Sequence, residues 1–213
     1  TGNNLNDVKS VVLEGTTIAA TIVSQTKKEL VITFPETTAN SAKLVITNET
    51  GPITTSQVFV NMNNAYKIFT DSYQNGFDNA SWGPAEISAA FFKSGSKSFK
   101  AGYNKGNWSA DGFANWSGVA NMPEYTYFSF WVKGASANYT LYLVGDQRDG
   151  GYGNSDKSVP INIPANVWTY FKIPMSSIQF WKKGGPLKQI GFWIEGPDAQ
   201  DEAFYFDDVI FVK

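Results

Sequence analysis

Three stretches of the sequence alternate a uniformly apolar set of side chains with a mixed aromatic and polar set: residues 125–133, 141–148 and 190–195. Alternate side chains of a β-strand face opposite sides of its sheet, so the apolar set is the expected core face of each strand. If the three strands share one sheet, its other face collects aromatic rings beside charged groups. The members of this expected face are Trp131, Tyr142, Asp146, Arg148, Trp193 and Glu195.

Such a face suits the recognition of a sugar. The axial C–H bonds of a sugar ring form an apolar patch that stacks on Trp or Tyr, while its hydroxyl groups need partners that donate or accept hydrogen bonds in fixed directions. Rings flanked by carboxylates and a guanidinium supply both. We therefore predict a sugar-binding platform on this face, with the Gly-rich segment 146–153 as its rim. An ordinary solvated turn is the alternative for that segment.

Four other tryptophans lie in segments rich in turn-forming residues. Trp82 belongs to a Ser-Trp-Gly element, whereas Trp108, Trp116 and Trp181 lie among Gly, Asn and Lys residues that predict loops. A tryptophan exposed on a loop is unfavourable unless it packs or binds, so several together indicate a functional patch. For each of these four, and for Trp131, bracing the fold is the alternative to contacting a sugar.

The composition excludes most kinds of catalysis. None of the 213 residues is His or Cys, which removes the Ser–His–Asp and Cys–His nucleophilic systems and every His- or Cys-ligated metal. A retaining glycosidase needs two carboxyl groups about 5–5.5 Å apart. The acidic residues after Trp193 cluster, but Gly196 and Pro197 interrupt the strand that would have to align them. We predict that this chain is not an enzyme.

The charge and hydropathy of the sequence exclude two classes of partner, nucleic acids and membranes. The net charge is −2 and no block of Lys or Arg occurs, so the sequence offers no electrostatic site for nucleic acid or anionic lipid. No run of 18 apolar residues is present either, and direct insertion of this chain into a membrane is not expected.

The elements that must carry these side chains are strands throughout. Up to about residue 61 the chain has no Trp or Tyr, and its β-branched runs between turn signals predict a small immunoglobulin-like β-sandwich over residues 1–61. Residues 62–213 hold all seven Trp and all ten Tyr in about nine strand-length runs. Without a helical period between them, these runs predict a jelly-roll β-sandwich. The fold class is therefore all-β.

The first segment resembles an IPT/TIG immunoglobulin-like domain. The likeness rests on Gly2 to Leu5, the step into residues 30–35, the run 43–47 and Gly51 before 58–60. The first strand of such a domain is missing here, so we expect more protein upstream. In such families the module usually serves as a spacer.

The second segment resembles a calcium-containing jelly-roll carbohydrate-binding module. The motifs that carry this likeness are Ile68-Phe69-Thr70-Asp71, Ser94 to Ser98, Phe128 to Gly134, Trp168 to Pro174 and Phe204 to Val209. The resemblance implies a structural Ca²⁺ held by Asp71 and Asp207, with Asp208 beside them, since calcium takes oxygen ligands only. Aspartates that merely form turns at strand ends are the alternative.

Together the two resemblances indicate a surface glycan-binding protein of the kind found in Bacteroidota. They imply a non-catalytic outer-membrane lipoprotein outside the cell that captures a β-glucan-type polysaccharide, with an outer-membrane glycan transporter complex as its partner. An accessory region of a secreted glycoside hydrolase and a structural adhesin are the other interpretations. The choice of β-glucan rests on the suitability of flat aromatic platforms for equatorially substituted chains.

Overall fold

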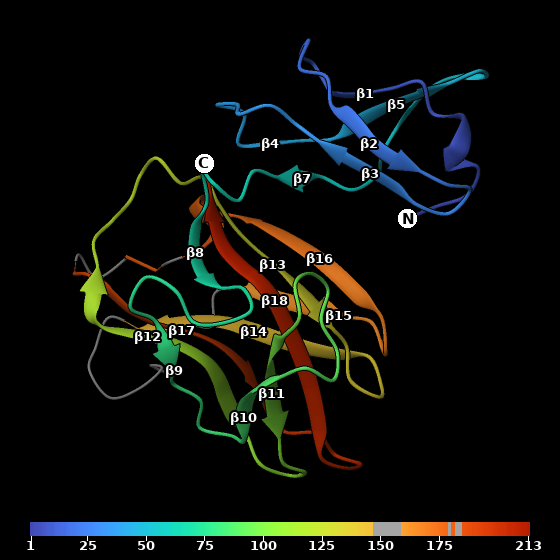
Figure 1. Ribbon diagram of the computed structural model, residues 1–213. Helices are drawn as coiled ribbons and strands as arrows, with labels where there is room; N and C mark the ends of the chain where they lie inside the picture. The colour runs from blue at the N-terminus through green and yellow to red at the C-terminus, as the bar shows by residue number, and fades with distance from the viewer. Residues whose placement is uncertain (147–158, 179, 182–184) are drawn as a thin grey trace. The chain divides into compact units, whose positions relative to one another are not determined.

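The computed structural model describes residues 1–146, 159–178, 180–181 and 185–213, and it divides into two compact units, Thr1–Ala65 and Tyr66–Lys213 (Figure 1). Strands dominate both units, and the helical elements described are two 3₁₀ turns, η1 (Leu5–Asp7) and η2 (Met175–Ser177). The all-β prediction is confirmed. In the described residues, no helix is long and apolar enough to cross a membrane.

Three small sheets make up the first unit. Their strands are β1 (Ser10–Leu13), β5 (Leu44–Asn48) and β6 (Gly51–Thr54), then β2 (Thr21–Gln25) with β3 (Leu30–Thr33), and β4 (Ser41–Ala42) with β7 (Phe59–Val60). The core is small, with Val8, Val11, Leu13 and Leu44 fully buried. Residues 51–54 form β6, which pairs with β5.

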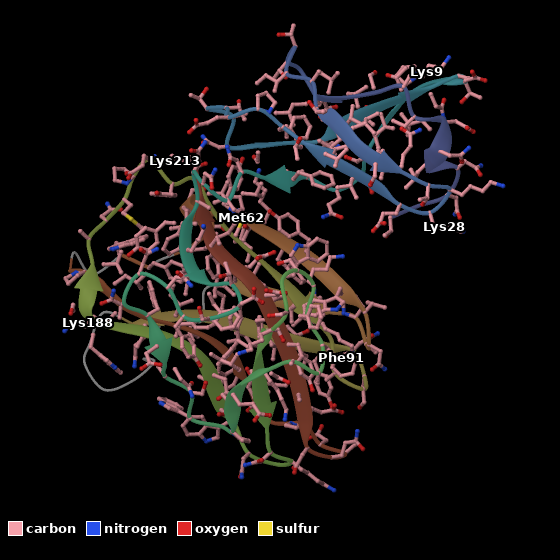
Figure 2. The ribbon with its side chains drawn as sticks, in the orientation of Figure 1. Lys9, Lys28, Met62, Phe91, Lys188 and Lys213 are labelled. Carbon is pink, nitrogen blue, oxygen red and sulfur yellow. The ribbon has the colours of Figure 1, made fainter. Side chains whose placement is uncertain are left out.

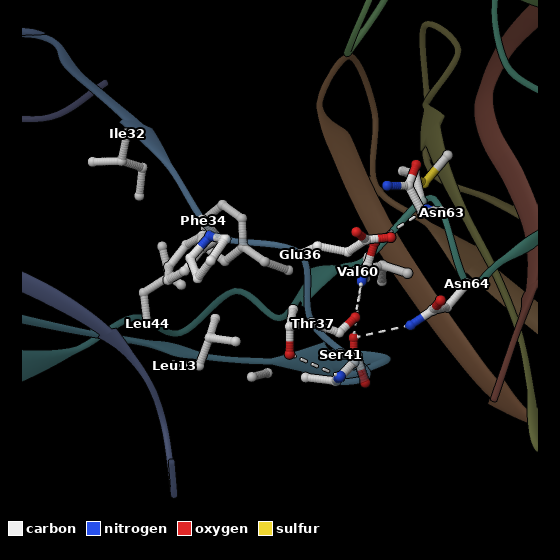
Figure 3. Close-up of a pocket in the computed structure, with 16 residues that line it drawn as sticks. Leu13, Ile32, Phe34, Glu36, Thr37, Ser41, Leu44, Val60, Asn63 and Asn64 are labelled. Atoms are coloured by element: carbon white, nitrogen blue, oxygen red, sulfur yellow. Dashed lines mark hydrogen bonds between the residues drawn. The ribbon is translucent and has the colours of Figure 1, made fainter. Parts of the chain in front are cut away.

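A cavity of about 620 Å³ opens in this unit between β3 and the β4–β7 pair (Figure 3). Apolar side chains such as Ile32, Phe34 and Leu44 line one part of it. At the other end Asn61 donates to the carbonyl of Thr37 and Asn64 to the carbonyl of Ala39. These bonds tie residues 61–64 to the first unit, which explains why the compact unit extends to Ala65.

The second unit consists of two facing antiparallel sheets, which Figure 1 shows as two layers. The β18 sheet contains β10 (Ala85–Ser88), β11 (Ser98–Tyr103), β18 (Glu202–Val212), β13 (Tyr127–Lys133) and β16 (Trp168–Pro174), with β8 (Tyr66–Phe69) also paired to β18. The β17 sheet contains, in order, β15 (Val159–Ile163), β14 (Tyr139–Asp146), β17 (Leu187–Ile194), β12 (Ser109–Val119) and β9 (Asp78–Asn79).

Aromatic rings fill the space between these sheets. Phe192 of the β17 sheet stacks on Phe206 of the β18 sheet, with ring centroids 4.1 Å apart, and Phe99 meets Phe113 at 4.6 Å. All four are fully buried. Where a strand alternates regularly, a ring anchored in this core places its two sequence neighbours on the outer face.

One central strand of the second unit, β12 (Ser109–Val119), is not predicted from the sequence. The segments around Trp108 and Trp116 are predicted to be loops, yet residues 109–119 form β12, which lies in the interior of the β17 sheet and pairs with β17 from Ser109 to Ala114. Small residues caused the error, because Ala110, Gly112 and Ala114 resemble loop composition although they alternate regularly with core side chains. Gly112 has no room for a Cβ, which would lie 2.1 Å from the carbonyl oxygen of Ile190.

Candidate functional site

The outer face of the β17 sheet carries a row of aromatic side chains that runs across its strands. Register places Tyr142 of β14 opposite Trp193 of β17, and Trp193 opposite Ala110 of β12. Past β9 the chain continues along β12, where the Trp82 N–H donates to the carbonyl of Ala110 at 3.1 Å. Trp82, Ala110, Trp193 and Tyr142 therefore form one rung, and Pro160 of β15 extends it.

All members of this rung point away from the core. Phe192 and Leu143, the sequence neighbours of Trp193 and Tyr142, are fully buried between the sheets. Residues directly opposite one another on paired strands share a face, so the two aromatic rings share the outer one. We call Trp82, Trp193 and Tyr142 the aromatic row.

The spacing of the row follows from the sheet. The rings of Tyr142 and Trp193 lie on adjacent strands with centroids 5.9 Å apart. Trp82 and Trp193 flank β12, so their backbones are separated by two strand spacings, about 10 Å. Between them stands Ala110, whose methyl group leaves the intervening surface low. The aromatic row therefore lacks a ring at Ala110, between Trp193 and Trp82.

Small apolar residues lie beneath the ring of Trp193. It is partly buried and packs against Ala110 and Val144, which are almost completely buried although they face outward. Gly112 and Gly191 lie on the next rung of the same face. Trp193 therefore packs on a layer of small side chains.

Trp82 is fixed in place by its neighbours. Its ring meets that of Trp108 edge to face, with centroids 5.3 Å apart, while both side chains remain about half exposed, at 47% and 59%. The next residue, Gly83, donates its N–H to Asp111 Oδ1 at 2.7 Å. A Cβ on Gly83 would lie 2.3 Å from the carbonyl oxygen of Gly102, so only glycine fits this turn.

Asp111 is a completely buried carboxylate beneath this turn. Burial raises its pKa to about 6, and the hydrogen bond from the Gly83 N–H offsets only part of that shift. The Gly83 N–H needs the acceptor oxygen of Asp111, because without it this donor would be buried with no hydrogen-bond partner. Asp111 thereby positions Trp82 at the end of the row.

Trp131 lies elsewhere. Its strand, β13, belongs to the β18 sheet, so the condition that all three stretches share one sheet is not met for residues 125–133. The Trp131 ring contacts Tyr170 at 5.1 Å, and the ammonium of Lys93 lies 4.2 Å from its centroid. On the same face Lys133 lies over the ring of Phe91, which Figure 2 labels. Lysines thus cover the rings of this face.

The remaining predicted residues are dispersed. Trp116 is exposed on β12, at the end opposite Trp108, and Glu195 is exposed directly after β17. Trp181 is partly buried against Phe180 and Phe211 and donates its Nε1–H to the carbonyl of Val119 at 2.9 Å, so it braces the sandwich.

Two further candidates, Asp146 and Arg148, lie at the edge of the described residues and beyond it. The backbone of Asp146 pairs with that of Gln189 at the end of β14. Arg148 and the predicted rim up to residue 153 lie outside the described residues, apart from Asp146 and its backbone pairing.

Sequence reasoning missed the polar residues beside Trp108. Asn104 and Asn107 precede it in the turn between β11 and β12, and both side chains are exposed. With Trp82, Gly83, Trp108 and Ser109 they line a cavity of about 260 Å³ at the rim of the sandwich. The signal available was the Asn-x-Gly-Asn turn next to a tryptophan, which was interpreted only as a loop.

The aspartates expected to hold calcium are bound by a backbone strap. The segment 93–97 crosses them, with the N–H groups of Ser96 and Lys97 donating to Asp71 Oδ1 at 2.6 and 2.7 Å. Those of Lys93 and Ser94 donate to Asp207 Oδ2 at 2.7 and 3.0 Å. The hydrogen bonds from Ser96 and Lys97 lower the pKa of Asp71, whereas burial raises the pKa of Asp207 to about 6.

This donor set does not fit a calcium ion as the strap is folded. Calcium requires six to eight oxygen ligands, whereas N–H groups occupy one oxygen of each of these carboxylates. In the part of the chain that the structure describes, no group of three or more acidic side chains is placed to hold a metal. A strap held by hydrogen bonds accounts for the arrangement.

We expect chelation to leave the fold intact. Because N–H groups satisfy Asp71 and Asp207, treatment with EDTA should shift the melting temperature by less than about 2 °C, which corresponds to at most about 1 kcal/mol for a chain of this size. Differential scanning fluorimetry with and without EDTA measures this. A larger drop that added Ca²⁺ reverses, but Mg²⁺ does not, would establish the calcium site that the family resemblance implies.

Several solved structures that resemble this chain are carbohydrate-binding modules. A family 11 module from a cellulosomal cellulase of Clostridium thermocellum is 14% identical, with a TM-score of 0.47 and coverage of 70% of this chain and 95% of that one. A family 29 module complexed with mannohexaose is 16% identical, with a TM-score of 0.44 over 70% and 90% of the two chains.

A third likeness covers both units. A module of the β-sandwich superfamily, described for its promiscuous specificity, is 15% identical with a TM-score of 0.49 over 97% of this chain and 85% of that chain. No family model matches the sequence, and no curated protein matches it. At these identities the likeness concerns the fold, and the function has to rest on the outer face of the β17 sheet itself.

Proposed function

We propose that this protein binds a polysaccharide without catalysis, on the outer face of the β17 sheet, by stacking sugar rings on the aromatic row. The observation that carries the proposal is the shared rung of Trp82, Trp193 and Tyr142. Rings on one rung of a sheet form a straight line across it, and an extended sugar chain can contact all of them at once.

The proposed ligand is a neutral β-glucan-type chain. A pyranose ring is comparable in length to the spacing between neighbouring strands, about 4.8 Å, so successive sugars along the rung meet Tyr142, Trp193 and, past Ala110, Trp82. Flat rings favour sugars whose substituents are equatorial. We expect micromolar or weaker affinity, on the order of −5 to −8 kcal/mol.

The absence of chemistry on this face supports a binding role. The sequence contains no His or Cys, and Glu195, the carboxylate next to the aromatic row, is exposed at the end of its strand. A general acid requires a partner carboxylate at a defined separation, and β17 ends before the other acidic residues that follow Glu195.

The wider setting is part of the same proposal. The first unit acts as an IPT/TIG-like spacer, and the protein works at the outer-membrane surface of a bacterium, where it delivers glycan to a transporter. In the alternative role, as an accessory region of a secreted glycoside hydrolase, the protein would use the same binding face. An adhesin would instead use the aromatic row to contact another protein.

Affinity gel electrophoresis tests the proposal. Wild-type protein should be retarded by at least one of laminarin, mixed-linkage β-glucan, xyloglucan, mannan and xylan. Tyr142→Ala should lose most of that retardation, since Tyr142 supplies one ring of the row, whereas Trp181→Phe should keep it because Trp181 braces the opposite end of β12. Absence of retardation by every glycan would overturn the proposal in favour of a protein-binding role.

A further inference from the structure

The cavity beside the aromatic row has the properties of a second, smaller sugar site. We define the rim notch as the residues that line it: Trp82, Gly83, Asn104, Asn107, Trp108 and Ser109. We propose that the rim notch binds a single neutral sugar that branches from the chain on the aromatic row, so that the protein selects branched over unbranched polysaccharides. This inference rests on the proposed function.

The chemistry of the rim notch matches one sugar ring. Trp82 and Trp108 form an exposed aromatic wall. The side-chain amides of Asn104 and Asn107 are exposed, and within the described part of the chain neither makes a side-chain hydrogen bond. A carboxamide both donates and accepts, as a ring bearing several hydroxyl groups requires.

Size limits the occupant to a single unit. Pockets for drug-sized ligands are about 300–1,000 Å³. The rim notch, at about 260 Å³, is smaller than that range, so it accommodates one pyranose and not a length of chain.

Position indicates a branch and not the backbone of the glycan. The aromatic row runs across the strands, whereas Asn104 and Asn107 lie in the turn that precedes β12, off the end of the strand. A chain on the row passes the rim notch at Trp82 without entering it. A substituent that projects along the strand direction from the sugar at Trp82 would enter, because Trp82 belongs to both surfaces.

The rim notch is held in shape before any ligand binds. The Gly106 N–H donates to the carbonyl of Pro197 at 2.9 Å, and the Lys105 N–H donates to Asp201 Oδ1 at 2.8 Å. The Asn107 N–H closes the turn on the carbonyl of Asn104. These bonds fix the turn to the segment after β17, so little ordering entropy is lost when a sugar binds.

Matched oligosaccharides test this inference. Isothermal titration calorimetry compares cellotetraose with its xylosylated counterpart, and mannohexaose with its galactosylated counterpart, so that each pair differs only in its branches. We expect at least one branched ligand to bind about 10-fold more tightly than its unbranched partner, the gain from stacking plus one or two hydrogen bonds.

The variants assign that gain to the rim notch. Asn104→Ala combined with Asn107→Ala should reduce the branched-to-unbranched ratio to below about 2-fold and leave the unbranched affinity and the melting temperature unchanged, because both side chains are exposed. Asn121→Ala, an exposed amide beyond the other end of β12, is the matched control and should keep the full ratio.

The two proposals fail in different ways. Equal binding of branched and unbranched ligands, or a ratio that survives in the double variant, would overturn the branch site while the binding role of the aromatic row stands. If neither member of either pair binds, and no glycan retards the protein on gels, the proposed function itself is overturned.

Discussion

Trp193→Ala is expected to weaken glycan binding by about 30-fold or more, enough to abolish retardation in affinity gels. Trp193 is the middle ring of the aromatic row and the one whose surroundings are shaped for it, with Ala110 and Val144 beneath. Truncation of a central interface tryptophan typically costs about 2 kcal/mol or more, which corresponds to about 30-fold in affinity. Starting from micromolar affinity, that loss reaches the limit of the gel assay.

The same substitution should cost the fold much less. Trp193 is only partly buried and lies outside the main core, so removal of its ring should lower the free energy of unfolding by about 1–2 kcal/mol. This is a decrease of a few degrees in melting temperature for a chain of this size. Urea unfolding of both proteins measures the difference. A much larger decrease would mean that the loss of binding reflects unfolding.

Trp131→Ala is the matched control. Trp131 is also a partly buried tryptophan on an outer face, but its strand belongs to the β18 sheet and Lys93 lies over its ring. Its removal should leave glycan affinity unchanged within about 2-fold. Loss of binding in Trp131→Ala together with retention in Trp193→Ala would place the glycan on the β18 sheet and contradict the aromatic row.

The sequence was sufficient for the strands whose core faces are made of large side chains. Residues 190–194 lie in a strand as their alternation predicts, because Ile190, Phe192 and Ile194 on every second position give the strand one face that must be buried. The same alternation placed Tyr142 and Trp193 on a common outer face.

Sheet membership could not be inferred in the same way. Residues 125–133 show as clear an alternation as 190–194, yet the two strands belong to different sheets. Period-2 patterning states which side chains share a face of one strand, but not which strands are neighbours, since pairing over long separations depends on the whole chain. Trp131 was grouped with Trp193 for that reason.

The rim notch could not be predicted from the sequence for a different reason. It depends on Trp82 and Trp108, 26 positions apart by subtraction of their residue numbers, and on a turn fixed by backbone hydrogen bonds to residues 197 and 201. None of these bonds has a sequence signature. Because the segments around Trp108 and Trp116 looked like loops, Trp108 just before β12 and Trp116 within it could not be assigned to opposite ends of one strand.

Asp111 should make the protein less stable as the pH rises from about 4 to 7. Its ordinary pKa is 3.8, and burial raises the pKa to about 6 in the folded protein. The folded state therefore holds a proton that the unfolded state releases, and stability falls with pH between these two values. A difference of 6 − 3.8 = 2.2 pKa units corresponds to about 3 kcal/mol, an order-of-magnitude figure.

Comparison with Asp111→Asn isolates this contribution. Asp207 also has a pKa raised to about 6, so the wild-type curve alone would combine both groups. Asparagine keeps an oxygen for the Gly83 N–H and cannot ionise. The free energy of unfolding of the wild type minus that of the variant, from urea titrations at pH 4 and pH 7, should fall by about 2–3 kcal/mol. Parallel pH curves for the two proteins would show that the carboxylate is not held protonated.

The cost of ionising Asp111 is linked to the binding face. Its oxygen holds the Gly83 N–H at 2.7 Å and so fixes Trp82, which belongs to both the aromatic row and the rim notch. Asp111→Ala, which removes that acceptor, should therefore weaken glycan binding, whereas Asp111→Asn should retain it at pH 7 while stabilising the fold. Equal affinities for the alanine and asparagine variants, measured by calorimetry at pH 7, would mean that Trp82 keeps its position without this hydrogen bond.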